Sequence, residues 1–403
     1  MVTARAAVLA TVMLLGGCEL IADIPTSSAS AQSDDAGGNG DDVITGDDAG
    51  GGDDAMPMPE CTVNPDCTTA AKPTCGADHV CRACQIDTDC GVNGVCMVDG
   101  TCAAAARIMY VSPTGTGTTC STAVPCALDQ AVAQIAANRD VIKLAPLLYD
   151  RTATLAIAPA VPVVIAGEGA TIRNMVAAMF GFTWTTTGDV TFTGITFDHN
   201  AKFGSECMGG KLTLARVTMK SSLLGFFAAN PCDVTAERTV WTGNSLYSIS
   251  IPDGTSTLHV RNSLFANNGT TDGTIAEIIL QDAALTGAIE NTTIANNLSN
   301  GQPSISCAGA FPIRNVISFG NAMPPTAACT VSYSDVEAGF AGTNTNNVTL
   351  NPLFVSATDY HLQPTSPVRG IGDPTNVLPL DIDFQPRPQP AGSAPDLGYD
   401  EVP

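Results

Sequence analysis

The sequence has few positive charges. Its 403 residues include 17 lysines and arginines against 39 aspartates and glutamates, which gives a formal net charge of -22 at pH 7. A chain with this excess of negative charge is repelled by phosphate backbones, so we exclude nucleic acid as a partner. The charge is also uneven, because residues 19–60 hold eleven carboxylates and no lysine or arginine. Much of the acidity therefore belongs to one segment near the N-terminus.

Long hydrophobic runs are missing as well. After Cys18 no stretch of about 18 apolar residues occurs, so the sequence predicts no transmembrane helix. At the N-terminus, Arg5 precedes an apolar stretch from Ala6 to Leu15 that is too short to span a bilayer, followed by two glycines and Cys18. This order is typical of a signal peptide over residues 1–17.

The cleavage site resembles the bacterial lipobox, whose cysteine is acylated, as by palmitate, and becomes the mature N-terminus. The matching residues are Leu15-Gly16-Gly17-Cys18. The resemblance implies a lipid on Cys18 that tethers an extracytoplasmic protein to a membrane of the cell envelope. Because Glu19 rather than an aspartate follows the cysteine, the lipobox rule favours the outer membrane.

The segment 18–60 has almost no large apolar side chains and is rich in Asp, Gly, Ser and Ala. Such a composition cannot bury enough surface to fold, so we expect a disordered acidic linker behind the lipidated cysteine. Residues 37–45 match one copy of a calcium-binding nonapeptide. Those repeats bind calcium between stacked copies, and no second copy follows. We therefore expect no cofactor or metal, with calcium as the only candidate.

Fifteen cysteines in an exported chain predict disulfides, and setting Cys18 aside leaves an even number. Eight of them form a tandem repeat over residues 61–102, with Asp66 and Asp89 each preceding the second cysteine of its set. The repeat consists of Cys61, Cys67, Cys75 and Cys81, then Cys84, Cys90, Cys96 and Cys102. Units of about twenty residues need disulfides because they cannot build a core. Spacing leaves their connectivity open, and only Cys81-x2-Cys84 would fit a zinc site.

From residue 107 to 340 the sequence consists of short strand-like runs, and from Phe192 onward it repeats a nine-residue frame with an apolar first position and, in most copies, an Asn at the end. The frames begin at Phe192, Leu214, Ala236, Val260, Ile289 and Ile313, with a degenerate copy at Val331. Repeats of twenty-odd residues with one short strand each predict a right-handed parallel β-helix, an all-β solenoid in which like residues stack. Asn suits its corners, because it tolerates left-handed backbone and its amide can bond to the next coil.

The remaining cysteines fit this solenoid. We predict that Cys207 pairs with Cys232 and Cys307 with Cys329, because each pair is separated by about one coil, and that Cys120 pairs with Cys126. The residues Glu237, Arg261, Glu290 and Arg314 follow successive first positions of the frames. They predict a ladder of alternating charge on the outer surface.

Two further segments carry a family resemblance over residues 107–403. The start, Met109–Gly115 followed by 127–138 and Asp140–Pro146, resembles pectin-lyase-like β-helix proteins, in which a helix with an apolar stripe covers the open end of the stack. The closing segment, 341–403, resembles the tail of bacterial surface proteins of the "choice-of-anchor Q" type. Its matching residues are Asn351–Phe354, Asp359–Leu362, Ser366-Pro367, Asp381–Asp383, Pro386–Pro388 and Pro395–Gly398. Phe384 departs from that pattern, which usually has Gly at this position.

The best cluster for catalysis is ordinary in composition. It consists of Asp198, His199, Lys202, Glu206, Lys211, Arg216, Lys220 and Arg238. Polysaccharide lyases on such folds need carboxylates beside a Lys or Arg base. A lyase here would require at least two of Asp198, Glu206, Asp233 and Glu237 to converge with one such base in a groove. Arg216 and Arg238, however, occupy the frame position that elsewhere holds Asn, so a structural turn role competes.

Two functions follow. The first is a surface-exposed lipoprotein whose β-helix is a non-catalytic binding or structural module for carbohydrate, matrix or a cell-surface protein. The alternative is a lyase or glycoside hydrolase acting on acidic polysaccharide. The fold implies neither, because β-helices carry both kinds of function.

Overall fold

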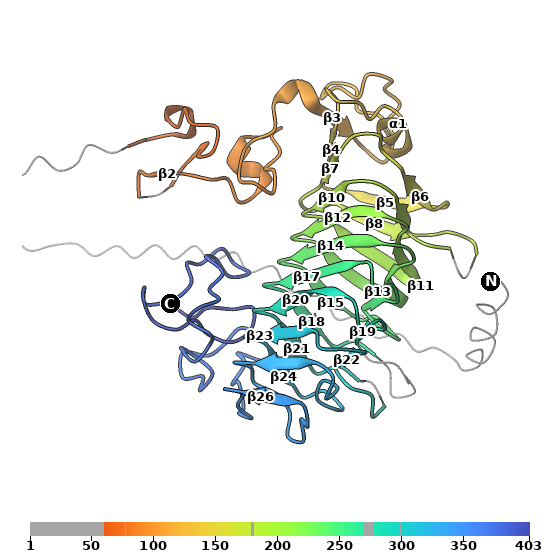
Figure 1. Cartoon of the computed structure of the whole chain (residues 1–403). Helices are drawn as coiled ribbons and strands as arrows, with labels where there is room; N and C mark the ends of the chain where they lie inside the picture. The colour runs from red at the N-terminus through yellow and green to blue at the C-terminus, as the bar shows by residue number, and fades with distance from the viewer. Residues whose placement is uncertain (1–59, 77, 179–180, 270–276, 299) are drawn as a thin grey trace, which may run out of the picture. The chain divides into compact units, whose positions relative to one another are not determined.

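A computed structural model describes residues 60–76, 78–178, 181–269, 277–298 and 300–403 of the chain. The predicted signal peptide, the lipidation site at Cys18, the acidic linker and the nonapeptide at 37–45 lie outside these residues. None of the helices in the described ranges has the length and hydrophobicity that a membrane span requires. The described chain is an all-β parallel solenoid with a small disulfide-rich module before it, as predicted (Figure 1).

The first sheet of the solenoid contains eleven strands, one from each successive coil. Neighbouring strands are parallel throughout. In order along the stack they are β3 (Ile108–Val111), β4 (Val141–Leu144), β7 (Val163–Ala166), β10 (Val190–Thr193), β12 (Gly210–Ala215), β14 (Cys232–Glu237), β17 (Thr257–Arg261), β20 (Thr286–Glu290), β23 (Pro312–Arg314), β25 (Thr330–Ser332) and β26 (Thr343–Thr345).

The second sheet has thirteen strands and forms the other two faces of the solenoid, because β11 (Thr196–Cys207) and β13 (Thr218–Ala228) each pair with strands of both faces. One face contains β5 (Leu148–Arg151), β8 (Thr171–Asn174), β15 (Val240–Thr242), β18 (Leu264–Ala266), β21 (Thr293–Ala295) and β24 (Ile317–Phe319). The other contains β6 (Leu155–Ile157), β9 (Trp184–Thr186), β16 (Ile249–Ile251), β19 (Ile278–Leu280) and β22 (Ile305–Cys307).

The first positions of the frames form one buried column, which confirms the predicted register. Each is the direct partner of the next across the first sheet, from Phe192 through Leu214, Ala236, Val260 and Ile289 to Ile313 and Val331. All of them are fully buried. A second inward column includes Trp241, whose indole stacks on the ring of Phe265 with 5.4 Å between centroids. Burial of these aligned apolar side chains is the main force that holds the coils together.

The last Asn of the frames forms the predicted amide ladder. Asn244, Asn268, Asn297 and Asn321 lie one above another, and the Nδ2 of each donates to the Oδ1 of the next at 3.0 or 3.1 Å. The left-handed corner is displaced, however, because positive φ falls at Asn267 and Asn296, one residue earlier. An inward amide cannot also occupy the outward corner, so two adjacent residues divide the two roles.

The helix that the family resemblance implied over 127–138 is much shorter. It is α1 (Leu128–Val132), and the residues after it form a tight turn, in which Ala136 and Arg139 exchange backbone hydrogen bonds, that leads into β4. A helix of this length gains little from its own hydrogen bonds. Leu128 and Ala131 are nevertheless buried in the core beside the first strands, with Val132 packed against it.

The disulfide-rich module consists of two units with the same connectivity, in which the first cysteine pairs with the third and the second with the fourth. The bonds are Cys61–Cys75, Cys67–Cys81, Cys84–Cys96 and Cys90–Cys102. The units contain the short elements η1 (Asn64–Asp66), β1 (Thr74–Cys75), β2 (Cys81–Arg82) and η2 (Asp87–Cys90), and η3 (Ala105–Arg107) leads to β3. In the solenoid the structure forms Cys120–Cys126, Cys207–Cys232 and Cys307–Cys329, the pairs that spacing predicted.

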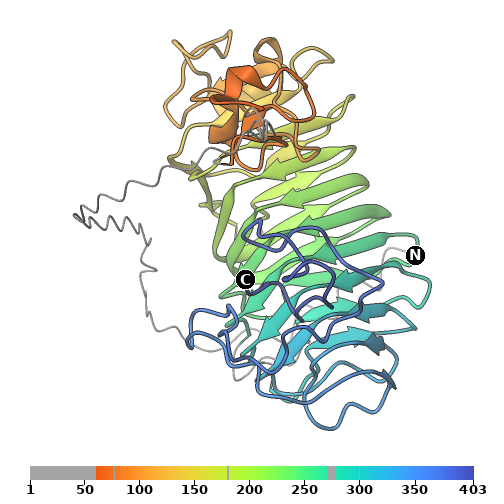
Figure 2. The same ribbon diagram turned by 90° about the vertical axis from the view of Figure 1, so that its left-hand side faces the viewer.

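The closing segment does not lie only beyond the last coil but returns along the side of the stack (Figure 2). Asn262 Nδ2 donates to the carbonyl of Leu380 at 2.9 Å, and Gly398 N–H donates to the carbonyl of Asn315 at 2.8 Å. A fully buried ion pair organises the segment, with Arg387 Nε 3.4 Å from Glu401 Oε2. The segment therefore lies against the corners that follow β14, β17 and β23, and it lines one groove together with the disulfide-rich module.

Candidate functional site

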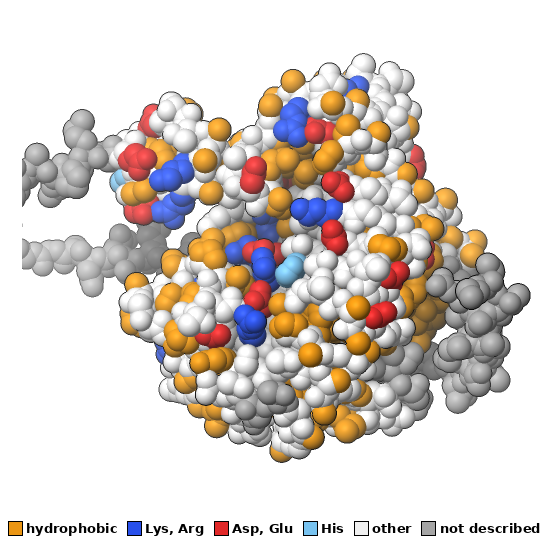
Figure 3. All heavy atoms as spheres, viewed as in Figure 1, with side chains coloured by type: hydrophobic (Ala, Val, Ile, Leu, Met, Phe, Trp, Pro, Cys, Tyr) orange, Lys and Arg blue, Asp and Glu red, His pale blue; other side chains and the backbone are white. Residues whose placement is uncertain are grey.

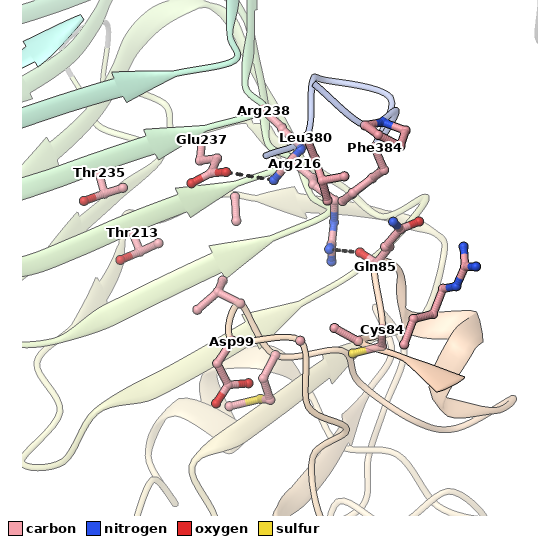
Figure 4. A pocket seen from close by; sticks show the side chains of 17 residues that line it. Cys84, Gln85, Asp99, Thr213, Arg216, Thr235, Glu237, Arg238, Leu380 and Phe384 are labelled. Atoms are coloured by element: carbon pink, nitrogen blue, oxygen red, sulfur yellow. Dashed lines mark hydrogen bonds and ion pairs between the residues drawn. The ribbon is translucent and has the colours of Figure 1, made fainter. Parts of the chain in front are cut away.

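A groove of about 520 Å³ lies where three parts of the chain meet. Its floor is the outer face of β12 and β14, with Thr213, Thr235 and Glu237. One wall is the disulfide-rich module, residues 82–85 and 97–100, and the other is the tail loop with Leu380, Phe384 and Pro386. Charged side chains of both signs gather on this face of the solenoid (Figure 3). Arg216 and Arg238 stand at its corner (Figure 4).

Arg216 and Arg238 occupy a backbone position that usually takes a smaller residue. Both have left-handed φ, at 55° and 53°, as have Asn262, Asn291 and Asn315 at the same corner of later coils. The turn role that we predicted for this column is therefore present. Left-handed backbone costs an ordinary residue about 1–2 kcal/mol, and Arg lacks the local hydrogen bonds with which Asn offsets that cost. Arg at two consecutive corners therefore has a role beyond the turn.

The side chain of Arg216 joins the solenoid to the disulfide-rich module. Nη1 donates to the carbonyl of Gln85, and Nη2 donates to Thr193 Oγ1 at 2.8 Å and lies 3.6 Å from Glu168 Oε1. Burial lowers the pKa of Arg216, but a guanidinium stays charged at neutral pH. Arg216 therefore fixes one wall of the groove by a charge-assisted hydrogen bond.

Arg238 fixes the opposite wall in the same way. Its Nε donates to the carbonyl of Asp381 at 2.7 Å, and its Nη1 donates to Glu237 Oε1 at 2.8 Å. The Cζ atom of Arg238 lies 4.6 Å from the centroid of the Phe384 ring, which is a cation–π geometry. Nη2 has no hydrogen-bond partner among the described residues. Arg238 thus holds the tail loop, and its Nη2 remains available to donate a hydrogen bond to a ligand.

A charged cluster behind Arg216 seats the second disulfide unit on the first coils. The backbone N–H of Asp87 donates to Glu168 Oε1 at 2.9 Å, and Asp87 Oδ2 is 3.9 Å from Lys143 Nζ. Burial raises the pKa of both Asp87 and Glu168. The first disulfide unit meets the second in an equivalent way, since Asn64, at the position matching Asp87, donates to the carbonyl of Asp89 at 2.8 Å.

The other residues singled out from the sequence lie away from the groove. Asp198, Lys202 and Glu206 are on β11 and Lys220 is on β13, all in the second sheet, where Asp198 is the direct partner of Lys220. Asp233 and Lys211 are partners on the first sheet but do not line the groove. His199 is buried inside, where its Nδ1 lies 2.6 Å from Thr183 Oγ1 and burial lowers its pKa to about 3.

Of the four candidate carboxylates, at least two of which a lyase would need in one groove, only Glu237 lines this groove. Glu237, Arg261, Glu290 and Arg314 are aligned on successive strands as predicted. Among the described residues only Arg261 and Glu290 of these four form an ion pair with each other, at 3.2 Å, and Glu290 is buried, so the exposed charge ladder is formed only in part. The sequence reasoning missed three residues of the groove, because they lie outside the repeated frames of the coils. They are Arg82, Asp99 and Phe384. Phe384 could have been found from its departure from the family's Gly, because its φ is 65°.

Comparisons with known proteins add little to this geometry. No family model and no curated protein matches the chain. Among solved structures, the chain is similar to the crystal structure of pectate lyase Pel9A, with 14% sequence identity and a TM-score of 0.43 over 74% of this chain and 97% of that one. The parallel β-helix is established by the strand register itself.

Proposed function

We propose that the chain is a surface-exposed bacterial lipoprotein of the "choice-of-anchor Q" kind, whose β-helix is a non-catalytic binding module for acidic carbohydrate. The observation that carries this proposal is Arg238 at the corner of the groove, whose Nη2 has no hydrogen-bond partner among the described residues, with Arg216 adding a second positive charge beside it. Guanidinium groups suit carboxylates and sulfates because their donors form a planar fork. The threonine hydroxyls of the floor and the ring of Phe384 add the polar and aromatic contacts with which proteins bind sugars.

The charges of the groove favour binding over catalysis. Its lining includes three arginines, Arg82, Arg216 and Arg238, against Asp99 and Glu237. Glu237 is already paired with Arg238, and Asp198 and Glu206 belong to the other sheet. A lyase or hydrolase requires carboxylates that are free to act on one substrate atom. The arrangement therefore supports the binding function more than the enzymatic alternative.

The proposed location rests on sequence features. The lipobox-like Leu15–Cys18 supports a lipid anchor, and Glu19 supports the outer membrane. The seven disulfides suit an oxidising compartment outside the cytoplasm. Labelling with radioactive palmitate in the producing cell tests the anchor, because Cys18→Ser should abolish the label and leave the export of the chain to be measured separately.

The binding function is tested with the purified full chain on an array of neutral and acidic polysaccharides, reading bound protein and released product. We expect binding to acidic chains without product. Replacing both corner arginines by Asn, the residue of the later coils, should weaken binding about tenfold or more while keeping the left-handed turns. Arg314→Asn, which removes an exposed arginine outside the groove, is the matched control.

Each remaining outcome argues against part of the proposal. Release of unsaturated sugar products would favour the lyase alternative. Undiminished binding by the double variant would place the ligand elsewhere on the solenoid.

A further inference from the structure

We propose that His361, Asp383 and Asp400 form a binding site for a divalent first-row transition ion such as Zn²⁺. The three residues come from separate turns of the closing segment, yet their candidate ligand atoms all lie within 4.8 Å of one another. One imidazole nitrogen and two carboxylate oxygens are ligands that such ions prefer. This site lies outside the groove, and the proposal does not depend on the function proposed for the groove.

The ring of His361 is oriented as a metal ligand would be. Its Nδ1 lies 2.5 Å from Asp359 Oδ1, and its Nε2 lies 2.8 Å from Asp383 Oδ2. Without an ion, both ring nitrogens lie at hydrogen-bond distance from a carboxylate. With an ion between Nε2 and Asp383, the remaining ring proton would be on Nδ1 and would be donated to Asp359. A histidine that binds metal through one nitrogen usually donates from the other to a carboxylate. Asp359 therefore fills the supporting position, and Nε2 the ligating one.

Asp400 supplies a second, independent observation. The residue is only 4% exposed, and its Oδ2 accepts a hydrogen bond from the backbone N–H of Leu362 at 2.7 Å. Within the described part of the chain, no ion pair is formed by this carboxylate, and the ring of His361, with its candidate ligand atom within 4.8 Å, is the cationic group beside it. Burying a charge is costly unless it is paired or coordinates a metal. A cation held between Asp400, Asp383 and Nε2 would be in direct contact with this buried carboxylate and would balance its charge.

The composition of the cluster selects the kind of ion. Calcium takes six to eight oxygen ligands and magnesium keeps most of its water, so neither suits a site built around an imidazole. The side chains of His361 and Asp383 are 39% and 48% exposed, which leaves room for water at the remaining coordination positions. In the alternative role, the imidazole itself bridges Asp359 and Asp383 and no ion is needed.

Binding at this site would act on the groove wall. Asp383 immediately precedes Phe384, whose ring contacts Arg238, and both belong to the loop that follows Asp381. Asp381 Oδ1 accepts hydrogen bonds from the backbone N–H groups of Asp383 and Gln385 at 2.9 and 2.8 Å. An ion that joins Asp383 to His361 and Asp400 therefore ties this loop to two other turns of the closing segment.

The test is a calorimetric titration of the untagged full chain with Zn²⁺, repeated with Co²⁺ to record the visible bands of a coordinated ion. We expect one ion per chain, which excess Ca²⁺ does not displace. Asp383→Asn should weaken binding about tenfold or more, because it removes a charged ligand but keeps an acceptor for the histidine ring. His79→Asn, which removes an exposed histidine of the disulfide-rich module, should bind as the parent chain does.

The opposite results overturn the proposal. Absence of stoichiometric Zn²⁺ binding would leave the cluster as a bridge of hydrogen bonds. If Asp383→Asn binds Zn²⁺ as tightly as the parent chain, the ion binds elsewhere. The titration of His79→Asn then shows whether it binds at His79. Asp383→Asn is the deciding variant because the side chain of Asp383 is half exposed, so its replacement leaves the fold intact.

Discussion

The guanidinium of Arg238 and the ring of Phe384 contact each other across the groove corner, with Cζ 4.6 Å from the ring centroid. Both residues have left-handed backbone, at φ 53° and 65°. Each of these conformations costs about 1–2 kcal/mol in an L-residue, so the contact joins two strained positions. Strain of this kind persists only where other interactions hold it, and it gathers at functional sites.

Phe384→Gly and Phe384→Ala separate the strain from the ring contact. Glycine adopts this φ freely. The free energy of unfolding of Phe384→Gly should therefore lie within about 1 kcal/mol of that of the parent chain, because relief of strain offsets the lost contact. Phe384→Ala keeps the strain and loses the ring, so it should be less stable than the Gly variant by about 1 kcal/mol. Denaturant unfolding measures both. Equal stability of the two variants would mean that the left-handed φ is not retained in solution.

Arg216→Asn tests the seating of the disulfide-rich module. Asn fits the left-handed corner, so the solenoid should keep its stability, whereas the hydrogen bond to Gln85 is lost. A bond from a charged donor contributes about 1.5–3 kcal/mol, so amides of residues 84–102 that are protected by docking should exchange about tenfold faster or more. Hydrogen exchange with mass spectrometry reads this, with Arg314→Asn as control. Unchanged exchange in 84–102 would show that Glu168 and Lys143 suffice.

Asn268→Ala should interrupt the amide ladder. The side chain accepts from the backbone N–H and the Nδ2 of Asn244 and donates to the carbonyl of Trp241 and to Asn297. Each buried group left without a partner costs about 1–3 kcal/mol, so we expect a loss of about 2–4 kcal/mol on denaturant unfolding. The exposed Asn230→Ala should change stability by less than about 0.5 kcal/mol. A comparably small effect at Asn268 would contradict a structural role for the ladder.

Glu277 predicts a dependence of stability on pH. It is 3% exposed, and burial raises its pKa to about 8 against a smaller opposing effect of a hydrogen bond from Ser248. Between the unfolded pKa near 4.5 and about 8 the folded state binds more protons, so stability falls as pH rises through this window. The slope contributed by one group is at most about 1.4 kcal/mol per pH unit.

Glu277→Gln should remove that slope and make the variant the more stable protein at pH 8, as seen in thermal or denaturant unfolding over the same window. Asp282→Asn, at an exposed carboxylate, is the matched control and should leave the slope in place. Parallel pH profiles for the parent and the Gln variant would mean that Glu277 is not buried in solution.

The stacking of the solenoid could be predicted from the sequence because it depends on local repetition. A frame that places Val260 and Ile289 in register needs no knowledge of distant contacts, and each strand pairs with its neighbour in the next coil. The ladder of Asn268 and Asn297 followed from the same periodicity. The periodicity did not predict that Asn267 would form the left-handed corner and Asn268 the ladder. Either residue can adopt left-handed backbone, and only packing decides which side chain points inward.

The groove could not be predicted, because its walls come from segments that are remote in the chain. Gln85 and Arg216 meet across 131 positions, and Arg238 and Asp381 across 143. Neither pair has a periodic signal. The sequence cluster around Asp198 gathered residues that are close in the chain but that the coil turns toward different faces. A solenoid makes neighbours of residues one coil apart, so proximity within one coil is a poor guide to a shared site.

Because the tail returns along the stack, a force that pulls on the C-terminus loads the contacts of the tail before it loads the strands. A pull on Pro403 is first resisted by the attachments of the closing segment, which bind it to coils well inside the stack at Asn315, Asn262 and Arg238. These attachments would break one after another, as in peeling, and only then would force reach the strands. The last coil is thus shielded from tension, and the tail acts as a strap that yields before the solenoid does.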